Sequence, residues 1–313
     1  MRIIKQILES AFFENRPPVL IDIGASGEIN QKWKPIAPYS ICIAFDADDR
    51  EFHITEQANK KYRKLISFNR IVTSTSTERA PFYLTASPFC SSLLMPQNDK
   101  LDSWIFSDLF KVERSTLLPA ITLAEALQKV NINYIDWFKT DTQGTDLRLY
   151  NTLPETLLKH VLVAEFEPGI MDAYHGEDKL FQVMQEMHKN DFWLSSMEVK
   201  GVQRLQNKYA KEFGMGTVTR VIRKSPGWAE VAYLRLPVVN EPREFLLLYI
   251  FALIEKQYGF ALEVADKALQ QFPNQIFNEC RNAVLTKIKT DRWKVPLIIF
   301  KRQIKKMLPG FND

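Results

Sequence analysis

The sequence predicts an α/β fold, in which a seven-strand sheet carries helices on both faces and is followed by a small all-helical C-terminal extension. Short apolar runs alternate with amphipathic segments of helical length between residues 17 and 236. This alternation is typical of a mostly parallel sheet whose strands are joined by helices. The first run, residues 19–23, is almost unbroken and ends at a glycine, as expected of a strand buried on both faces. Beyond Pro237 only helical patterns remain.

Strands are expected at seven apolar runs, with helices between most of them. The predicted strands cover residues 19–23, 41–46, 70–75, 135–141, 160–168, 192–199 and 227–236. Helices are predicted at about 54–64, 122–130, 145–153 and 178–190, and residues 80–86 are expected to form one arm of a hairpin. Thr122 and Glu125 form the capping box that begins the second of these helices. Residues 200–227 are predicted as a long polar connection.

The change of composition divides the chain into a main domain, residues 1–238, and a helical extension, residues 239–313. The extension begins with the helical patterns REFLLLYIFALIEKQ and GFALEVADKALQQFPN, which resemble one tetratricopeptide hairpin. Because a single repeat cannot bury its own core, we expect it to pack against the main domain.

The composition indicates an ordinary globular protein, since 46% of the 313 residues are hydrophobic and 25% are charged. Cys42, Cys90 and Cys280 are far apart and lack metal-ligand spacing, which favours a reducing compartment over a disulfide framework. The N-terminus lacks the uninterrupted apolar segment of a signal peptide. The longest apolar run begins at Phe245 and has ten residues, well short of the roughly 20 that span a membrane. We therefore expect a cytoplasmic protein.

The net charge of +4 is unevenly distributed along the chain. From Arg281 onward nine Lys and Arg residues stand against two acids, so this tail carries +7 and the rest of the chain −3. Pro296 suits the first turn of a helix over 296–308, on which apolar residues form one stripe beside four basic residues. Two interpretations stay open: the stripe covers the end of the helical extension, or it attaches the protein peripherally to the inner face of an anionic membrane.

A glycine turn follows the first predicted strand, in the segment IDIGASGE. Gly24 and Gly27 allow a close approach of the backbone to a ligand, and nucleotide-type ligands bind at such strand ends. The flanking acids Asp22 and Glu28 disfavour a pyrophosphate, whereas S-adenosylmethionine carries a sulfonium and an ammonium and no phosphate. Asp46 follows Gly24 by 22 residues, a spacing that suits an acid on the ribose of either S-adenosylmethionine or NAD. The predicted cofactor-binding residues are Asp22, Gly24, Ala25, Ser26, Gly27, Asp46 and Ala47.

Several motifs together resemble the FkbM-type family of S-adenosylmethionine-dependent methyltransferases. They are, in this order, LIDIGASGE, AFDADD, SPFCSSLLMPQ, WFKTDTQGTDL, AEFEPGIMDAYHG and DFWLSSM, and the resemblance covers residues 17–236. It implies a Rossmann-like sheet of seven strands, S-adenosylmethionine as cofactor, and O-methylation of a hydroxyl on a sugar, glycan or natural-product acceptor. The sequence departs from the family pattern at Asp146, where the family favours Glu, and at LYNTL, where the family tends to have Leu-Lys-Gly.

Methyl transfer to a hydroxyl requires that the acceptor be positioned and its proton removed, and a base assists the second step by about 10²–10⁴-fold. Asp141 and Glu165 end the fourth and fifth predicted strands, and His175 lies in the loop that follows the fifth. These three are the candidate catalytic residues. Each also has a structural interpretation: a hydrogen bond to the turn for Asp141, orientation of a neighbour for Glu165 and an exposed turn for His175. The candidate substrate-binding residues are Ser92, Gln143 and Tyr174.

Other functions fit the sequence less well. A divalent metal held by Asp141 and Glu165 stays open, but no cluster of side chains has metal-ligand spacing, so no metal site is predicted. A nicotinamide oxidoreductase requires the third glycine of its phosphate-binding turn, which this turn lacks. A nucleic-acid methyltransferase is disfavoured because the Asn/Asp-Pro-Pro-aromatic element and the Pro-Cys dipeptide are both missing. A catalytically inactive scaffold that binds partners through its helical end stays open as an alternative, and the oligomeric state is not predicted.

Overall fold

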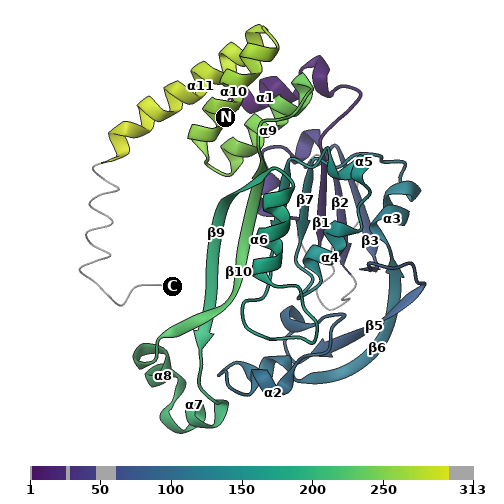
Figure 1. Cartoon of the computed structure of the whole chain (residues 1–313), viewed down its shortest axis with the longest axis vertical. Helices are drawn as coiled ribbons and strands as arrows, with labels where there is room; N and C mark the ends of the chain where they lie inside the picture. The colour runs from purple at the N-terminus through teal and green to yellow at the C-terminus, as the bar shows by residue number, and fades with distance from the viewer. Residues whose placement is uncertain (1, 26–28, 47–60, 296–313) are drawn as a thin grey trace.

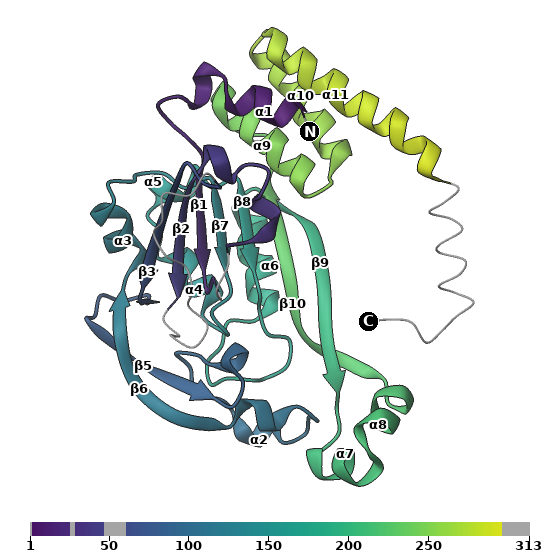
Figure 2. The same cartoon turned by 180° about the vertical axis from the view of Figure 1, so that it is seen from behind.

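The computed structural model describes residues 2–25, 29–46 and 61–295, and within them seven strands form the main sheet. The strand order is β3-β2-β1-β7-β8-β10-β9. The bounds are β1 Val19–Ile23, β2 Ile41–Asp46, β3 Lys64–Asn69, β7 Trp137–Thr140, β8 Val163–Phe166, β9 Phe192–Gln203 and β10 Lys224–Arg235. The first five strands in this order are parallel, and β10 runs antiparallel to β8 and β9. The predicted fold class, a Rossmann-like sheet of seven strands with helices on both faces, is therefore confirmed (Figure 1, Figure 2).

Two predicted elements are wrong. The third strand is β3 and not residues 70–75, of which only Ile71–Val72 forms a short strand, β4. Because β3 lies at the edge of the sheet, its side chains are mostly exposed or half-buried and give no continuous apolar run. Residues 200–227 contain the end of β9, the start of β10 and two short helices, α7 (Asn207–Phe213) and α8 (Met215–Val221). The predicted helices at 54–64 and 296–308 lie largely or wholly outside the described residues.

A second, three-stranded sheet lies beyond the carboxyl ends of the central strands (Figure 1). In it β6 (Val112–Ile121) pairs parallel with β4 and antiparallel with β5 (Arg79–Thr85). The predicted hairpin arm thus belongs to β5, but its partner escapes prediction because the sequence of β6 mixes charged and apolar residues. Three short elements connect the two strands: η4 (Pro88–Cys90), α2 (Asn98–Leu101) and η5 (Ser107–Phe110).

Helices pack against both faces of the main sheet. One face is covered by α3 (Leu123–Lys129), α4 (Asp146–Asn151), α5 (Glu155–Leu158) and α6 (Leu180–Lys189). On the other face lie α9 (Pro242–Ile254), α10 (Tyr258–Gln271), α11 (Gln275–Asp291) and the N-terminal helix α1 (Arg2–Leu8). Short turns, η1 (Ala11–Phe13), η2 (Gln31–Trp33) and η3 (Ala37–Tyr39), accompany this face, and η6 (Arg292–Lys294) follows α11.

The ten-residue apolar run of the sequence lies in α9, which is buried nearly all round. It shares one hydrophobic cluster with α10, α11 and residues of β1, β2, β7 and β8, so the helical extension completes the core under one face of the sheet. Within the described part of the chain, no helix combines the length and the apolar character that a membrane span requires.

A buried ion pair joins the extension to the sheet at the amino ends of the central strands. The guanidinium of Arg243, in the first turn of α9, donates two hydrogen bonds of 2.8 Å to the carboxylate of Asp136, which directly precedes β7. Asp136 also accepts a hydrogen bond of 2.9 Å from the backbone N–H of Val19, at the start of β1. Two further N–H groups of Arg243 donate to the carbonyl oxygens of Arg16 at 2.9 Å and Pro17 at 3.2 Å. One side chain thus connects α9, β1 and β7.

Because both members of this pair are buried, removal of one should leave an uncompensated charge. We expect Arg243→Ala to lower the free energy of unfolding by about 3–5 kcal/mol. Arg281→Ala is the matched control, since Arg281 pairs with Asp266 at the surface, and there the expected loss is about 0–1 kcal/mol. Urea denaturation measures both. Equal losses in the two variants would mean that the buried pair does not join the extension to the sheet in this way.

Candidate functional site

A cavity of about 470 Å³ opens at the carboxyl ends of β1, β2, β7 and β8, and residues of β4, β5, η4 and η5 complete its lining. β2 and β7 lie on opposite sides of β1, so the chain leaves this strand in one direction and returns on the other side. In open α/β sheets ligands bind at such a point, where the strand order reverses. The volume is also that of an ordinary small-molecule site. We take this cavity as the candidate functional site.

The turns after β1 and β7 meet at the floor of the cavity. Gly24 has φ +80°, and a Cβ at this position would lie 1.9 Å from the carbonyl oxygen of Asp141. The backbone N–H of Gly24 donates to the carbonyl of Phe45 at 2.9 Å, and that of Asp141 donates to the carbonyl of Ile23 at 2.9 Å. Glycine is therefore required here both by the backbone conformation and by the close approach of the second turn.

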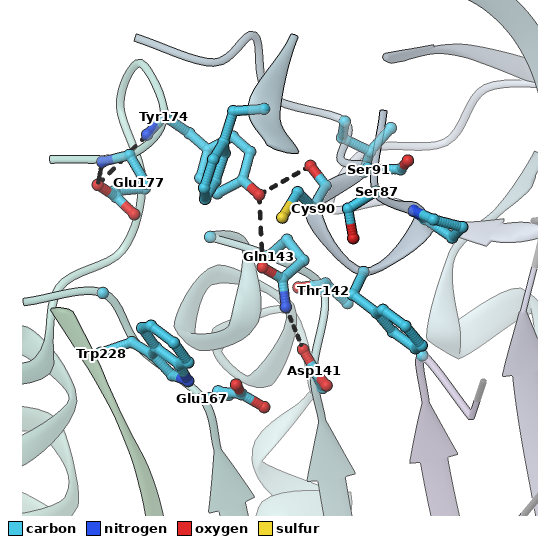
Figure 3. A pocket seen from close by; sticks show the side chains of 18 of the residues that line it. Ser87, Cys90, Ser91, Asp141, Thr142, Gln143, Glu167, Tyr174, Glu177 and Trp228 are labelled. Carbon is cyan, nitrogen blue, oxygen red and sulfur yellow. Dashed lines mark hydrogen bonds between the residues drawn. The ribbon is translucent and has the colours of Figure 1, made fainter. Parts of the chain in front are cut away.

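A line of polar side chains crosses the cavity from Asp141 through Gln143 to Tyr174 (Figure 3). The side-chain amide of Gln143 donates to Asp141 Oδ1 at 2.7 Å. Its carbonyl oxygen faces the hydroxyl of Tyr174 at 3.4 Å, while that hydroxyl donates to the backbone carbonyl of Cys90 at 2.8 Å. Gln143 is held in the left-handed region, with φ +56°, a conformation that is uncommon for a residue with a side chain and often found at functional sites. The side-chain amide of Gln143 thus fixes the orientation of the Asp141 carboxylate, which lines the cavity.

Asp146 fixes the turn that carries Asp141. Its carboxylate is fully buried and accepts hydrogen bonds from the hydroxyl of Thr140 at 3.0 Å and from the backbone N–H of Thr142 at 2.8 Å. Its other oxygen accepts from the backbone N–H of Glu167 at 3.0 Å. One short side chain therefore connects the ends of β7 and β8.

Glu167 lies just beyond the end of β8 and faces Asp141 across the cavity floor (Figure 3). Burial, the negative charge of Asp141 and a hydrogen bond to it raise the pKa of Glu167 to about 9. At neutral pH Glu167 is therefore protonated, and its O–H is shared with the Asp141 carboxylate. Two carboxyl groups that hold one proton between them are a common arrangement for proton transfer at active sites.

One part of the cavity wall, here called the aromatic roof, is apolar and rich in aromatic rings. Phe106 stacks on Trp228 with ring centroids 6.3 Å apart, and Phe110 packs edge-on against Phe106 at 5.1 Å. The other large apolar side chains of the lining include Phe45, Phe82, Phe89, Leu93, Leu109 and Met171. Of the described residues that line the cavity, Arg70 alone is basic, whereas Asp46, Asp141, Glu167 and Glu177 carry carboxyl groups. The cavity thus favours a ligand with apolar surface and no negative charge near the carboxyl pair.

Five of the predicted site residues line this cavity. They are Gly24 and Asp46 among the cofactor-binding candidates, Asp141 among the catalytic candidates, and Gln143 and Tyr174 among the substrate-binding candidates. Ser26, Gly27 and Ala47 lie outside the described residues. Ala25 is buried and donates its backbone N–H to the carbonyl of Phe45 at 3.1 Å. Ser92 is also buried, behind the wall, where its hydroxyl donates to the backbone carbonyl of Gln143 at 2.8 Å.

Asp22 lies beneath the glycine turn, outside the cavity lining. Its carboxylate accepts hydrogen bonds from Lys139 Nζ at 2.6 Å and from the backbone N–H of Asn30 at 2.9 Å. Burial alone would lower the pKa of Lys139, but the adjacent carboxylates of Asp22 and Asp141 raise it above its ordinary value. The negative charge of Asp22 is therefore compensated, and the sequence argument that it repels a pyrophosphate loses its force. Asp22 supports the turn.

Two catalytic candidates are corrected by their positions. Glu165 points to the face of the sheet that α9 covers, where Trp137 Nε1 and Lys32 Nζ both donate to it at 2.7 Å. Lys32 in turn pairs with Glu255 at 3.0 Å, so Glu165 helps to attach the helical extension. His175 is exposed and does not line the cavity. Side chains alternate along β8, which directs Glu165 to a face, whereas Glu167 follows the end of the strand and reaches the site.

Glu167 and the aromatic roof are the parts of the site that the sequence analysis missed. Glu167 belongs to the AEFEP motif, and strict alternation along a strand would place it on the same face as Glu165; it reaches the cavity because β8 ends at Phe166. Trp228 and Phe106 come from distant segments and meet only through the tertiary fold. In the described residues no group of three or more His, Cys, Asp or Glu side chains has an arrangement that could hold a metal ion.

Comparison with known proteins leaves the family open, because no protein-family model and no curated protein matches the chain.

The pKa of Glu167 makes stability depend on pH in a defined direction. This carboxyl is protonated in the folded protein between its ordinary value of 4.5 and about 9, a range in which it is ionised in the unfolded chain. Folded stability therefore falls as the pH rises through this window. Glu167→Gln, which cannot ionise, should be more stable than the wild type at about pH 8.5 by at least about 1 kcal/mol, the value of one pKa unit.

At about pH 5 the advantage of Glu167→Gln should largely vanish, because both proteins then carry a neutral group. Urea denaturation at the two pH values measures the difference, with the exposed Glu155→Gln as the control for loss of a surface carboxyl. The same difference at both pH values would contradict the protonated state of Glu167.

Proposed function

We propose that this protein is an S-adenosylmethionine-dependent methyltransferase that methylates a hydroxyl group. One observation carries the proposal: the glycine turn with Asp46 on one side and the Asp141–Glu167 carboxyl pair on the other line a single cavity at the point where the strand order reverses. The motifs that resemble the FkbM-type family supply residues to both parts, and the seven-strand sheet is the one that the resemblance implies.

The residues of the cavity fit the proposed cofactor. Gly24 lines the cavity with bare backbone, and Asp46 ends β2 beside it, where a carboxylate can accept the two ribose hydroxyls. Ile71 and Val72 of β4 offer an apolar surface for a base. The carboxylate of Asp141 favours a sulfonium in its neighbourhood. S-adenosylmethionine supplies an electrophilic methyl group when bound.

The carboxyl pair provides the base that a hydroxyl acceptor needs. Asp141 accepts the hydroxyl proton, and Gln143 orients its carboxylate through the 2.7 Å hydrogen bond to Oδ1. Glu167 keeps its own proton at neutral pH and donates to Asp141, which disperses charge on the pair. The apolar roof excludes water from this side and strengthens these electrostatic interactions.

The lining also limits the acceptor. With carboxyl groups near the expected position of the transferred methyl and a roof of aromatic rings, the cavity favours an uncharged acceptor that presents an apolar face beside its hydroxyl. The apolar face of a neutral sugar and the ring system of a natural product both meet this description, whereas nucleic acid and phosphorylated acceptors do not.

We also propose a cytoplasmic location, since Cys42, Cys90 and Cys280 are free and buried.

Binding of the cofactor is the first test, and it separates an enzyme from an inactive scaffold. Titration calorimetry should detect S-adenosylmethionine and its demethylated product binding to the wild-type protein. Asp46→Ala should weaken both by roughly tenfold or more, because two charge-assisted hydrogen bonds to the ribose are lost. Asp178→Ala is the control, since Asp178 is a carboxylate held by Arg148 outside the cavity lining.

NADH, titrated in parallel, tests the alternative that the cavity binds a dinucleotide, whose phosphates the basic Arg70 of the lining could attract. Tight binding of NADH in place of S-adenosylmethionine would contradict the proposal.

Removal of the base is the second test. Transfer of a labelled methyl group to pooled neutral glycans and hydroxylated natural products identifies an acceptor first. Asp141→Asn should then lower turnover about 10²–10⁴-fold, since the amide cannot accept the proton, while affinity for the cofactor changes less than about tenfold. Asp266→Asn, at the surface of α10, should behave as the wild type. Full turnover in Asp141→Asn would leave this residue a structural role only.

A further inference from the structure

The hairpin of α7 and α8 stands at the end of the long β9–β10 arm, at the opposite end of the molecule from α9–α11 (Figure 1, Figure 2). Its two helices are joined at Gly214, whose φ of +79° permits the sharp turn. Four large apolar side chains of the hairpin are exposed: Tyr209 at 40%, Phe213 at 57%, Met215 at 51% and Val221 at 77%. Exposed apolar side chains gathered on one projecting element indicate an interaction surface.

The same segment is strongly basic. Residues 204–224 contain six basic side chains and one acid, all of them exposed: Arg204, Lys208, Lys211, Glu212, Arg220, Arg223 and Lys224. Lys211 approaches Asp108 at 3.3 Å, and Asp108 also pairs with Lys111, so this acid lies at the base of the hairpin. The projecting part therefore combines exposed apolar side chains with excess positive charge, the combination by which peripheral proteins bind anionic membranes.

The hairpin is well anchored to the rest of the protein. Ala210 and Val218 are buried against Ile105, and the backbone N–H of Ile105 donates to the carbonyl of Gln203 at 3.3 Å. Ile105 is followed directly by Phe106, which lines the cavity, and Leu109 at the cavity wall is 44% exposed. The hairpin and the wall of the cavity therefore share one support, at the same end of the molecule.

We infer that the α7–α8 hairpin docks on an anionic lipid surface. A second copy of the chain is a poorer partner, because a symmetric contact would bring the same excess of positive charge together from both sides. Nucleic acid is a poorer partner too, because of the four exposed apolar side chains only Tyr209 and Phe213 have a ring on which a base could stack, and the most exposed one, Val221, does not. A lipid surface accepts both features at once, since basic residues bind the headgroups and apolar side chains enter the interface.

Sedimentation of the full-length protein with vesicles tests this inference independently of methyl transfer. The vesicles contain either phosphatidylcholine alone or equal parts of phosphatidylcholine and phosphatidylserine. We expect binding to the second kind only, weakened at high salt. Replacement of three charges, Lys208→Gln, Arg220→Gln and Arg223→Gln, should reduce the partition coefficient about a hundredfold. Replacement of two apolar tips, Phe213→Ser and Val221→Ser, should reduce it at least about tenfold.

Matched variants elsewhere on the surface serve as controls. Lys34→Gln, Lys129→Gln and Lys189→Gln remove three exposed basic residues, and Phe181→Ser with Met184→Ser removes two exposed apolar side chains of α6. All four multiple variants should keep the thermal midpoint of the wild type, because the altered side chains are exposed.

Three results would overturn the inference. The wild type could ignore anionic vesicles at low salt, or sediment equally with both kinds of vesicle. The hairpin variants could also bind like the controls, which would assign binding to another surface, including the basic C-terminal tail. Self-association in analytical ultracentrifugation that the hairpin variants abolish, without vesicle binding by the wild type, would identify a second copy of the chain as the occupant instead.

Discussion

The close approach of two turns, those that follow β1 and β7, is the constraint on which the candidate site depends. Gly24 lies so near the carbonyl of Asp141 that no side chain fits between them. This contact fixes the position of Asp141, and the buried carboxylate of Asp146 then fixes the end of β8 relative to β7 through the backbone N–H of Glu167. Three strand ends are thus held together by one glycine and one aspartate, before any ligand is considered.

Charge compensation explains which carboxyl groups support the fold and which are available for chemistry. Asp22 is paired with Lys139, Glu165 with Lys32 and Asp136 with Arg243, and all three lie outside the cavity lining. Glu177 lines the cavity but is paired with Lys179 at 2.6 Å and accepts a hydrogen bond from the backbone N–H of Ala173. The Asp141–Glu167 pair differs, because its members face one another and share a proton. A perturbed carboxyl pair in a cavity is the kind of feature that marks a functional site.

How much could be predicted from the sequence depended on whether the signal was local. Buried central strands appear as apolar runs, so β1, β2, β7 and β8 and the residues at their ends, Gly24, Asp46 and Asp141, follow from the pattern. The edge strand β3 and the strand β6 do not, because half-exposed strands lack such runs. The choice between Glu165 and Glu167 turns on where β8 ends, and strand ends are the least certain part of any sequence-based assignment. The aromatic roof comes from segments more than a hundred residues apart, so only the tertiary fold brings it together.

The two ends of the main sheet are packed differently. At the amino ends of the strands, Arg243 and the buried helix α9 attach the extension through a bidentate ion pair and a continuous core. At the carboxyl ends the chain instead adds the second sheet, the η4–η5 segment and the α7–α8 hairpin, which enclose a cavity and leave apolar side chains exposed. Because Ile105 anchors the hairpin and Phe106 lines the cavity, a partner bound at the hairpin would contact the same segment that contacts a ligand. Dense packing at one end therefore leaves the other end to form a cavity and to expose apolar side chains.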